Sequence, residues 1–284
     1  MKNAFAWSVR REIWEHRSVW LAPLGVAGFV LVAFFIGTGH LPDPDKFHTM
    51  SAATQRTVVA MPFSIAASAI LLTAFVVGIF YCLDALFAER RDRSILFWKS
   101  MPVSDTTTVL SKAIVPFAVI PAIATVIALA TQAILVVSAA LIMSVKGVDT
   151  ALLFDNLPFG GMTVGLLYGI VVHAFWYAPI YALLLVASVA TRRPVVWIIA
   201  PALVVQLLEK IAFGTSYSGD FIGYRLFGAM KEAFQPGALR GPITSLSQLD
   251  PIRYLSSPGL WLGLLAAAAL LYVAIRLRRS REAL

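Results

Sequence analysis

The chain has few charged residues for its length. Only 13% of its 284 residues are Asp, Glu, Lys or Arg, whereas soluble domains carry roughly 25%. Hydrophobic residues make up 59% of the chain, and the mean hydropathy is +0.81. Because so little charge cannot cover a water-exposed surface, this composition excludes an ordinary soluble domain. It predicts an integral membrane protein.

The chain also lacks the motifs of common catalytic and metal sites. It has no G-x-x-x-x-G-K-[ST] phosphate loop, no H-E-x-x-H, no C-x-x-C and no G-x-S-x-G. Its one cysteine, Cys82, lies in an apolar run and cannot form a disulfide within the chain. The histidines at 16, 40, 48 and 173 are scattered, which argues against a metal site. We therefore expect neither enzymatic activity nor a bound cofactor in this chain.

A surface that would bind nucleic acid is missing as well. The net charge is +8 and the pI is about 9.8, but the basic residues alternate with apolar runs instead of collecting on one soluble face. Such alternation is typical of a protein whose basic loops orient it in a membrane. We expect no nucleic-acid partner.

Long apolar runs are what the chain has in abundance. Six of them reach the roughly 20 residues that a helix needs to cross a bilayer. The third and fourth are longer than one crossing requires but too short for two, so each is predicted to be one tilted or protruding helix. The runs cover residues 18–39, 57–83, 113–145, 156–191, 194 to about 213, and 254–275.

The distribution of charge supports six crossings, although Glu209 and Lys210 interrupt the fifth run. With a cytoplasmic N-terminus, the inner segments hold fifteen basic and seven acidic residues, a net charge of +8, and the outer segments hold eight of each. Removing the fifth crossing would place the Arg-rich end of the chain outside, against the positive-inside rule. We expect one membrane domain over 1–284 with both termini cytoplasmic.

Two segments outside the runs are predicted to lie at the membrane surface. Residues 1–17 carry Phe5, Val9 and Ile13 at a spacing of four, the pattern of an amphipathic interfacial helix. The outer segment 214–253 has an aromatic helical face and belongs at the outer interface or partway into the membrane. That face is made by Phe221, Tyr224, Phe227, Met230 and Phe234.

The segment 88–112 combines dense charge with an apolar cluster. Ile95, Leu96, Phe97 and Trp98 follow one another among charged residues. Leaving such side chains in water forfeits roughly 1.5 to 3 kcal/mol for each one that could be buried. Either the lipid headgroups or a partner protein is therefore expected to cover them.

His173 is the one ionisable residue predicted deep inside a run. A neutral imidazole bonded to a neighbouring helix and a polar contact for a substrate are both consistent with that place. We name His173, Trp176 and Tyr177 as a possible substrate path. The absence of embedded carboxylates argues against an ion-coupled carrier.

Three stretches resemble one family of transport proteins. ERRDRSILFWKSMPVSDTTTVLSK at 89–112 closely resembles the cytoplasmic loop of ABC-2-type permeases, also called type V exporters, the membrane subunits of ABC transporters. HAFWYAPIYALLL at 173–185 and LEKIAF at 208–213 are similar to two further stretches of these permeases. Together with the predicted layout, the resemblance covers nearly the whole chain.

The resemblance implies a docking role for the loop. It implies a short coupling helix that binds a separate ATPase subunit, where ATP and Mg are held, and two permeases paired with two ATPases. An apolar centre with charged residues at its edge is the usual anatomy of a protein interface. The matching positions are Glu89, Arg91, Asp92, Arg93, Ile95, Leu96, Phe97, Trp98, Lys99 and Pro102.

The sequence leads us to expect a permease subunit of an ATP-driven exporter in a bacterial inner membrane. The resemblance implies a path between two permeases, a homodimer or a pair of similar chains, with the second and fifth spans facing it. The apolar spans favour an amphipathic or lipid-like cargo, such as a peptide, a drug or a lipid-linked molecule. An ion-coupled secondary transporter that uses His173 and a membrane scaffold without transport remain the alternatives.

Overall fold

The structure, a computed structural model, describes residues 4–37, 49–95, 97, 103–236, 238 and 241–280, and it is all-α. The one β-bridge among these residues joins Phe234 to Leu249. The helices are α1 (Ala4–Glu15), α2 (Ser18–Gly37), α4 (Ala52–Ala85), α5 (Phe87–Arg91), α7 (Asp105–Ile114), a π-helical turn (Val115–Val119), α8 (Ile120–Val145), α9 (Ala151–Asn156), α10 (Phe159–Trp176), α11 (Ala178–Ala190), α12 (Pro194–Phe213), α13 (Tyr217–Ala233), a 3₁₀ turn (Leu246–Gln248), α14 (Pro251–Ser256) and α15 (Pro258–Ser280).

Six helical stretches of the described chain are long and apolar enough to cross a membrane, as predicted. The chain is therefore a multi-pass membrane protein by the length and hydropathy of its helices. The stretches are Ser18–Gly37, Ala52–Arg91, Asp105–Val145, Phe159–Trp176, Pro194–Phe213 and Pro258–Ser280.

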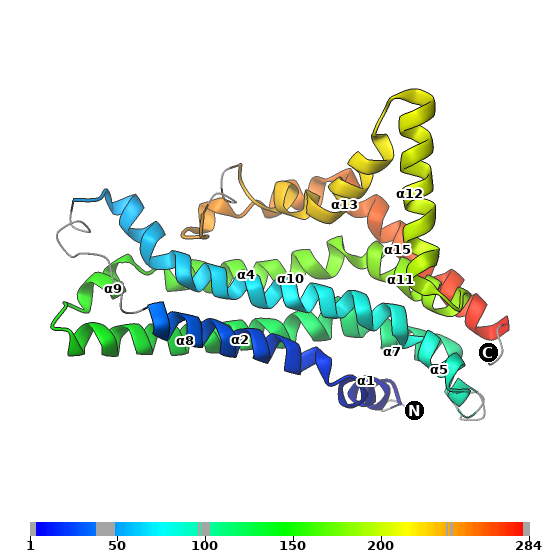
Figure 1. Cartoon of the computed structure of the whole chain (residues 1–284), viewed down its shortest axis with the longest axis horizontal. Coiled ribbons are helices and arrows are strands. Elements are labelled where there is room, and N and C mark those ends of the chain that lie inside the picture. The colour runs from blue at the N-terminus through cyan, green and yellow to red at the C-terminus, as the bar shows by residue number, and fades with distance from the viewer. Residues whose placement is uncertain are drawn as a thin grey trace.

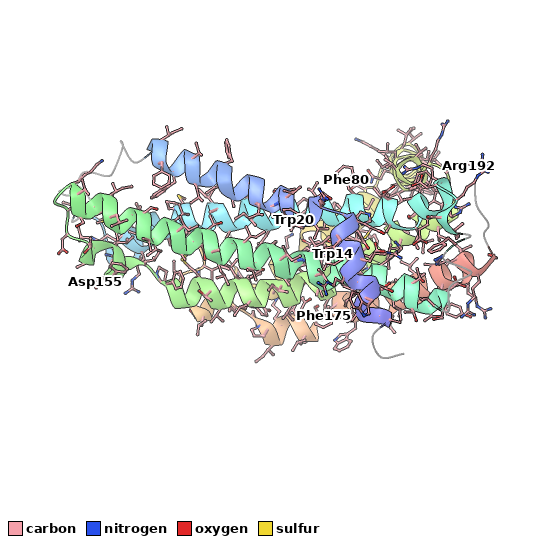
Figure 2. The ribbon with its side chains drawn as sticks, turned by 90° about the horizontal axis from the view of Figure 1, so that it is seen from below. Trp14, Trp20, Phe80, Asp155, Phe175 and Arg192 are labelled. Carbon is pink, nitrogen blue, oxygen red and sulfur yellow. The ribbon has the colours of Figure 1, made fainter. Side chains whose placement is uncertain are left out.

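Most of these helices lie along one long axis. In Figure 1, α2, α4, α8 and the line formed by α10 and α11 run side by side, and α15 packs against α11. α1, α5, α7 and the end of α15 lie at the same end of the bundle, which we call the basic end, while α9 lies at the opposite end. Figure 2 shows Arg192 at the basic end and Asp155 at the other.

Small residues let the helices approach closely in the centre of the bundle. Ala66, Ala74 and Gly78 lie on the buried side of α4. A Cβ atom added to Gly78 would lie 3.0 Å from the hydroxyl oxygen of Tyr181, which is fully buried on α11. The glycine at this position lets the Tyr181 ring pack closely against α4, and a larger residue would require the ring to shift.

The structure corrects the prediction that the fourth run is a single helix. It is divided into α10 and α11 at Tyr177, and Pro179 lies in the first turn of α11. Proline has no N–H to donate to the carbonyl four residues earlier, so the ladder of hydrogen bonds is interrupted there. The third run is one long helical stretch, as expected, with a π-helical turn at Val115–Val119 that contains Pro116.

α1 lies across the bundle axis at the basic end. It is seen end-on in Figure 1 and crosses the other helices in Figure 2, where Trp14 is labelled on it. Trp7 and Trp14 are exposed, and the guanidinium of Arg10 lies 5.4 Å and 4.7 Å from their ring centroids. Glu12, by contrast, faces the bundle and is fully buried.

α12 leaves the bundle instead of running alongside it (Figure 1). Pro194, its first residue, is the only buried residue of the helix. It has the length and hydropathy of a span, yet apolar side chains are exposed on all its sides. Such a surface must be covered by lipid or by another chain, because water would not solvate it.

Candidate functional site: a buried charge cluster and the loop it holds

Six charged side chains meet inside the basic end of the bundle. They come from four helices that are far apart in the sequence, α1, α5, α7 and α15. Three are acidic and three are basic, so the cluster has no net charge when all six are ionised. Its members are Arg11, Glu12, Glu89, Asp105, Lys112 and Arg278.

Glu12 joins α1 to two spans. Its Oε1 atom lies 2.8 Å from Nζ of Lys112, and its Oε2 atom accepts a 2.8 Å hydrogen bond from the hydroxyl of Tyr81 on α4. Burial raises the pKa of the Glu12 carboxyl, but the charge and hydrogen bond of Lys112, with the hydrogen bond from Tyr81, hold it below its ordinary value of 4.5. Glu12 is therefore ionised at neutral pH.

Glu89 joins the short helix α5 to the same cluster. Its carboxylate is ion-paired with Lys112 at 3.2 Å and with Arg278 at 3.1 Å, and the side chain is 8% exposed. Arg278 also lies 3.5 Å from Asp105 at the start of α7. The cluster thus ties the segment that follows the second span to the third span and to the last one.

A second set of contacts holds α5 on α11. The backbone N–H groups of Leu86 and Phe87 both donate to Oγ of Ser188, at 2.9 Å and 2.8 Å. Arg90 donates to the carbonyl of Val189 at 2.7 Å. Ser188 therefore binds the amide groups that the junction of α4 and α5 leaves without helical partners.

The predicted docking residues in the described chain fall into two groups. Glu89 and Ile95 face inward, and Ile95 is 1% exposed, so both pack inside this chain. Arg91, Asp92 and Phe97 are exposed, as is Arg93. The remaining predicted positions, Leu96, Trp98, Lys99 and Pro102, lie outside the described residues.

The exposed part of this segment is a charged turn with an aromatic residue. Arg91 pairs with Asp92 at 3.0 Å and with Asp84 at 3.8 Å. Arg93 has a φ of +58°, the left-handed conformation that non-glycine residues seldom adopt, and the chain turns there directly after α5. Phe97 is 59% exposed.

The residues predicted as a substrate path lie at the break between α10 and α11. Nε2 of His173 is 2.8 Å from the hydroxyl of Tyr181, so the imidazole has a neighbouring partner. Nε1 of Trp176 donates to the carbonyl of Arg225 at 3.0 Å, and the hydroxyl of Tyr177 donates to that of Leu226 at 3.0 Å. Trp176 and Tyr177 thus hold α13, a role that the sequence did not predict.

Glu209, which interrupts the fifth run, binds the start of α13. It accepts hydrogen bonds from the hydroxyl of Thr215 at 2.9 Å and from the backbone N–H of Ser218 at 2.9 Å. A carboxylate at a helix N-terminus satisfies amide groups that have no partner within the helix. The charge in this run therefore serves the turn between α12 and α13.

A metal site does not fit the one acidic cluster that could offer ligands in the described chain. Glu12, Glu15 and His16 bring ligand atoms within 4.8 Å of one another. Both oxygens of Glu12 are already engaged, one by Lys112 and the other by Tyr81. Binding a cation there would require breaking the buried cluster.

A shallow groove of about 450 Å³ runs along one side of α4. Ser64 and Ser68 place hydroxyl groups in it between larger apolar side chains, and Gly241 and Pro242 close one side. The second span therefore has a mixed polar and apolar surface that the other helices of this chain leave open.

Several residues of this site were missed because their partners are distant in sequence. Lys112 is separated from Glu12 by 100 residues, and Ser188 from Leu86 by 102. The only local signal is a single polar residue beside or within an apolar run, as at Lys112 and Ser188.

No significant match is found when the chain is compared with protein families, with curated proteins or with solved structures.

Proposed function

We propose that this protein is the membrane-spanning permease subunit of an ATP-driven exporter. The observation that carries the proposal is the segment around α5. Phe97 and the charged turn at 91–93 are exposed there, and α5 itself is ion-paired through Glu89 to other spans. A separate ATPase subunit would dock there and would bind the ATP and Mg. This chain would perform no chemistry itself.

The attachment of α5 to other helices suits the docking segment to transmit force. A segment attached only to its own helix would bend when a partner pushes on it. α5 is attached through Glu89 to the third and last spans, and through Ser188 to α11. Movement of a docked ATPase would therefore displace several spans together instead of deforming the loop.

The proposed path lies between two copies of this chain. The second and fifth spans are the two that the ABC-2 resemblance places along such a path. The groove on α4 and the uncovered sides of α12 support this arrangement, because both leave surface for a second copy. The mixed surface of α4 suits an amphipathic or lipid-like cargo that carries both apolar and polar parts.

The proposed orientation places the basic end in the cytoplasm of a bacterial cell, with the protein in the inner membrane. The charge difference of +8 between the two sides supports this orientation through the positive-inside rule. Both termini and the docking segment would then face the compartment that contains ATP.

The test is removal of the aromatic residues of the docking segment. The double variant Phe97→Ala/Trp98→Ala is expected to lose the ATPase subunit, since each true interface hot spot contributes on the order of 2 kcal/mol or more. The wild-type protein is purified from its own cells in mild detergent, and the P-loop ATPase that accompanies it is identified and quantified.

The matched control is Phe80→Ala, which removes an aromatic residue that is 66% exposed on α4, outside the docking segment. It should retain the ATPase. Wild-type amounts of ATPase bound to the Phe97→Ala/Trp98→Ala variant would contradict the proposed docking segment.

A further inference from the structure

α13 lies along the side of the spans instead of covering their ends. It packs against α10, its Arg225 side chain reaches α15, and Figure 1 shows it lying lengthwise on the bundle. Trp176 and Tyr177 donate to two successive carbonyls of this helix, those of Arg225 and Leu226. The middle of α13 therefore lies beside the break between α10 and α11.

The depth of Arg225 follows from two neighbouring helices. Gly263 in α15, which faces Arg225, precedes Arg276 by 13 residues, or about 20 Å of helix. Trp176 precedes Val189 by 13 residues along α10 and α11, again about 20 Å if the short break is counted as helix. A hydrocarbon core is about 30 Å thick. If the core begins at the level of Arg276 and Val189, at the basic end, both helices place Arg225 within it, in the far half.

Arg225 lies in a slot that α15 forms with glycines. Its guanidinium lies 5.0 Å from the ring centroid of Trp176 and donates to the carbonyl of Gly259 at 3.1 Å. A Cβ atom at Gly263 would overlap the guanidinium, so only a glycine fits there with the side chain in this position. The spacing of Gly259 and Gly263, G-x-x-x-G, thus accommodates an arginine of the same chain.

No carboxylate of the described chain forms an ion pair with Arg225. The two acidic residues of α13 are engaged elsewhere, because Asp220 is bonded to Ser216 and Glu232 lies 3.6 Å from Arg253. A guanidinium has five N–H groups, and the described residues accept from one of them. An unpaired cation within the hydrocarbon is costly and is usually retained for a function.

Anchoring α13 does not explain the charge. Trp176 and Tyr177 already hold its backbone, and a neutral amide could donate to the Gly259 carbonyl as well as a guanidinium does. What a guanidinium adds is two parallel N–H donors that match a phosphate or a carboxylate. The Arg225 side chain is half-buried and lies beside exposed apolar side chains of α13 and α15.

We propose that Arg225 binds the anionic headgroup, a phosphate or a carboxylate, of an amphiphile whose chains lie along α13 and α15. The amphiphile is either a phospholipid of the bilayer or the cargo itself. Only the cargo alternative rests on the proposed export function. Trp176 holds the guanidinium in place, and the two glycines leave room for it.

The experiment measures lipid binding to the purified full-length chain, without any ATPase, so its outcome is independent of the export proposal. Native mass spectrometry compares phosphatidylglycerol with phosphatidylcholine of the same acyl chains. The preference of the wild-type protein for phosphatidylglycerol is expected to fall at least tenfold in Arg225→Gln and less in Arg225→Lys. The control Arg253→Gln removes a more exposed arginine and should change the preference little.

A second arm separates the two sources of the anion. Dodecyl phosphate, a single-chain anion, is added as a competitor and compared with uncharged dodecyl maltoside. Displacement of phosphatidylglycerol by dodecyl phosphate alone would indicate a site open to anionic cargo, while resistance to it would indicate a bilayer lipid. An unchanged preference in Arg225→Gln, with a thermal unfolding curve like that of the wild type, would overturn the proposal.

Discussion

At the scale of single residues, the protein buries charge where it must join helices. Lys112 is 2% exposed and lies between two carboxylates, those of Glu12 and Glu89. A buried ion pair adds little net stability compared with apolar packing, but the loss of one partner leaves an uncompensated charge. Because the members of the cluster come from four helices, its ion pairs form only when those helices are packed together.

We expect Lys112→Met to destabilise the protein by about 3 to 5 kcal/mol, since Glu12 and Glu89 would lose the buried cation that they share and keep only the partly exposed Arg11 between them. The triple variant Lys112→Met/Glu12→Gln/Glu89→Gln should recover part of this loss. Thermal unfolding in detergent measures both, with Arg279→Met, at an exposed position, as the control. Equal loss in Lys112→Met and Arg279→Met would show that the cluster is not the cause.

The pair of His173 and Tyr181 gives a second prediction at this scale. Removing the imidazole leaves the fully buried hydroxyl of Tyr181 without this partner, which costs about 1 to 3 kcal/mol. His173→Ala should therefore destabilise the protein more in the wild-type background than in the Tyr181→Phe background.

If a proton relay through His173 drove transport, His173→Ala would abolish transport together with its pH dependence. We expect a partial and cargo-dependent loss instead.

At the scale of elements, the helices are interrupted where the chain changes partners. The fourth span breaks at Tyr177, and the residues around the break bind α13. Helix α4 ends at Ala85, and Ser188 binds the amide groups at its junction with α5. At the junction of α4 and α5, a remote residue binds the free backbone groups, whereas at the break between α10 and α11 the neighbouring side chains bind α13.

Ser188→Ala tests the junction of α4 and α5. It leaves the N–H groups of Leu86 and Phe87 without their acceptor, at a cost of about 1 to 3 kcal/mol for each buried group. Hydrogen exchange at these two amides should accelerate, while exchange in the middle of α8 stays unchanged. Ser188→Thr keeps the hydroxyl oxygen and should preserve more protection than alanine. Identical exchange in all three proteins would contradict the role of Ser188.

At the scale of the whole molecule, α12 is the least buried of the six membrane-length helices in the described chain. Its apolar surface is open along its length, whereas the other spans contact one another. A helix of 20 residues with this hydropathy is long enough to cross the bilayer. Whether it crosses decides on which side α13 enters the membrane.

Cysteine labelling tests this crossing directly. After Cys82→Ser, single cysteines are placed at Arg193 and Ser216, which flank α12, and at Ser280 and Asp149 as markers of the two ends of the bundle. An impermeant reagent added outside intact cells should label 216 and 149 but neither 193 nor 280. Labelling of 193 and 216 from the same side would show that α12 does not cross.

The sequence by itself determined the class of the protein and the number of its apolar helices. Run length and the scarcity of charge are local properties, because a bilayer accepts a helix according to its own composition. A helix over 4–15 and the exposure of Phe97 agree with the local pattern, but that pattern did not predict that Glu12 would be the buried residue of α1.

The tertiary structure decided which polar residues act together. Glu12, Lys112 and Arg278 look like separate charges at the edges of apolar runs, and Arg225 looks like a residue of an outer loop. Only packing brings the first three into one buried cluster and inserts Arg225 beside Trp176 and Gly263. The physical reason is that the energy of a charge depends on its neighbours and on its distance from water, and both are set by helices that are remote in sequence.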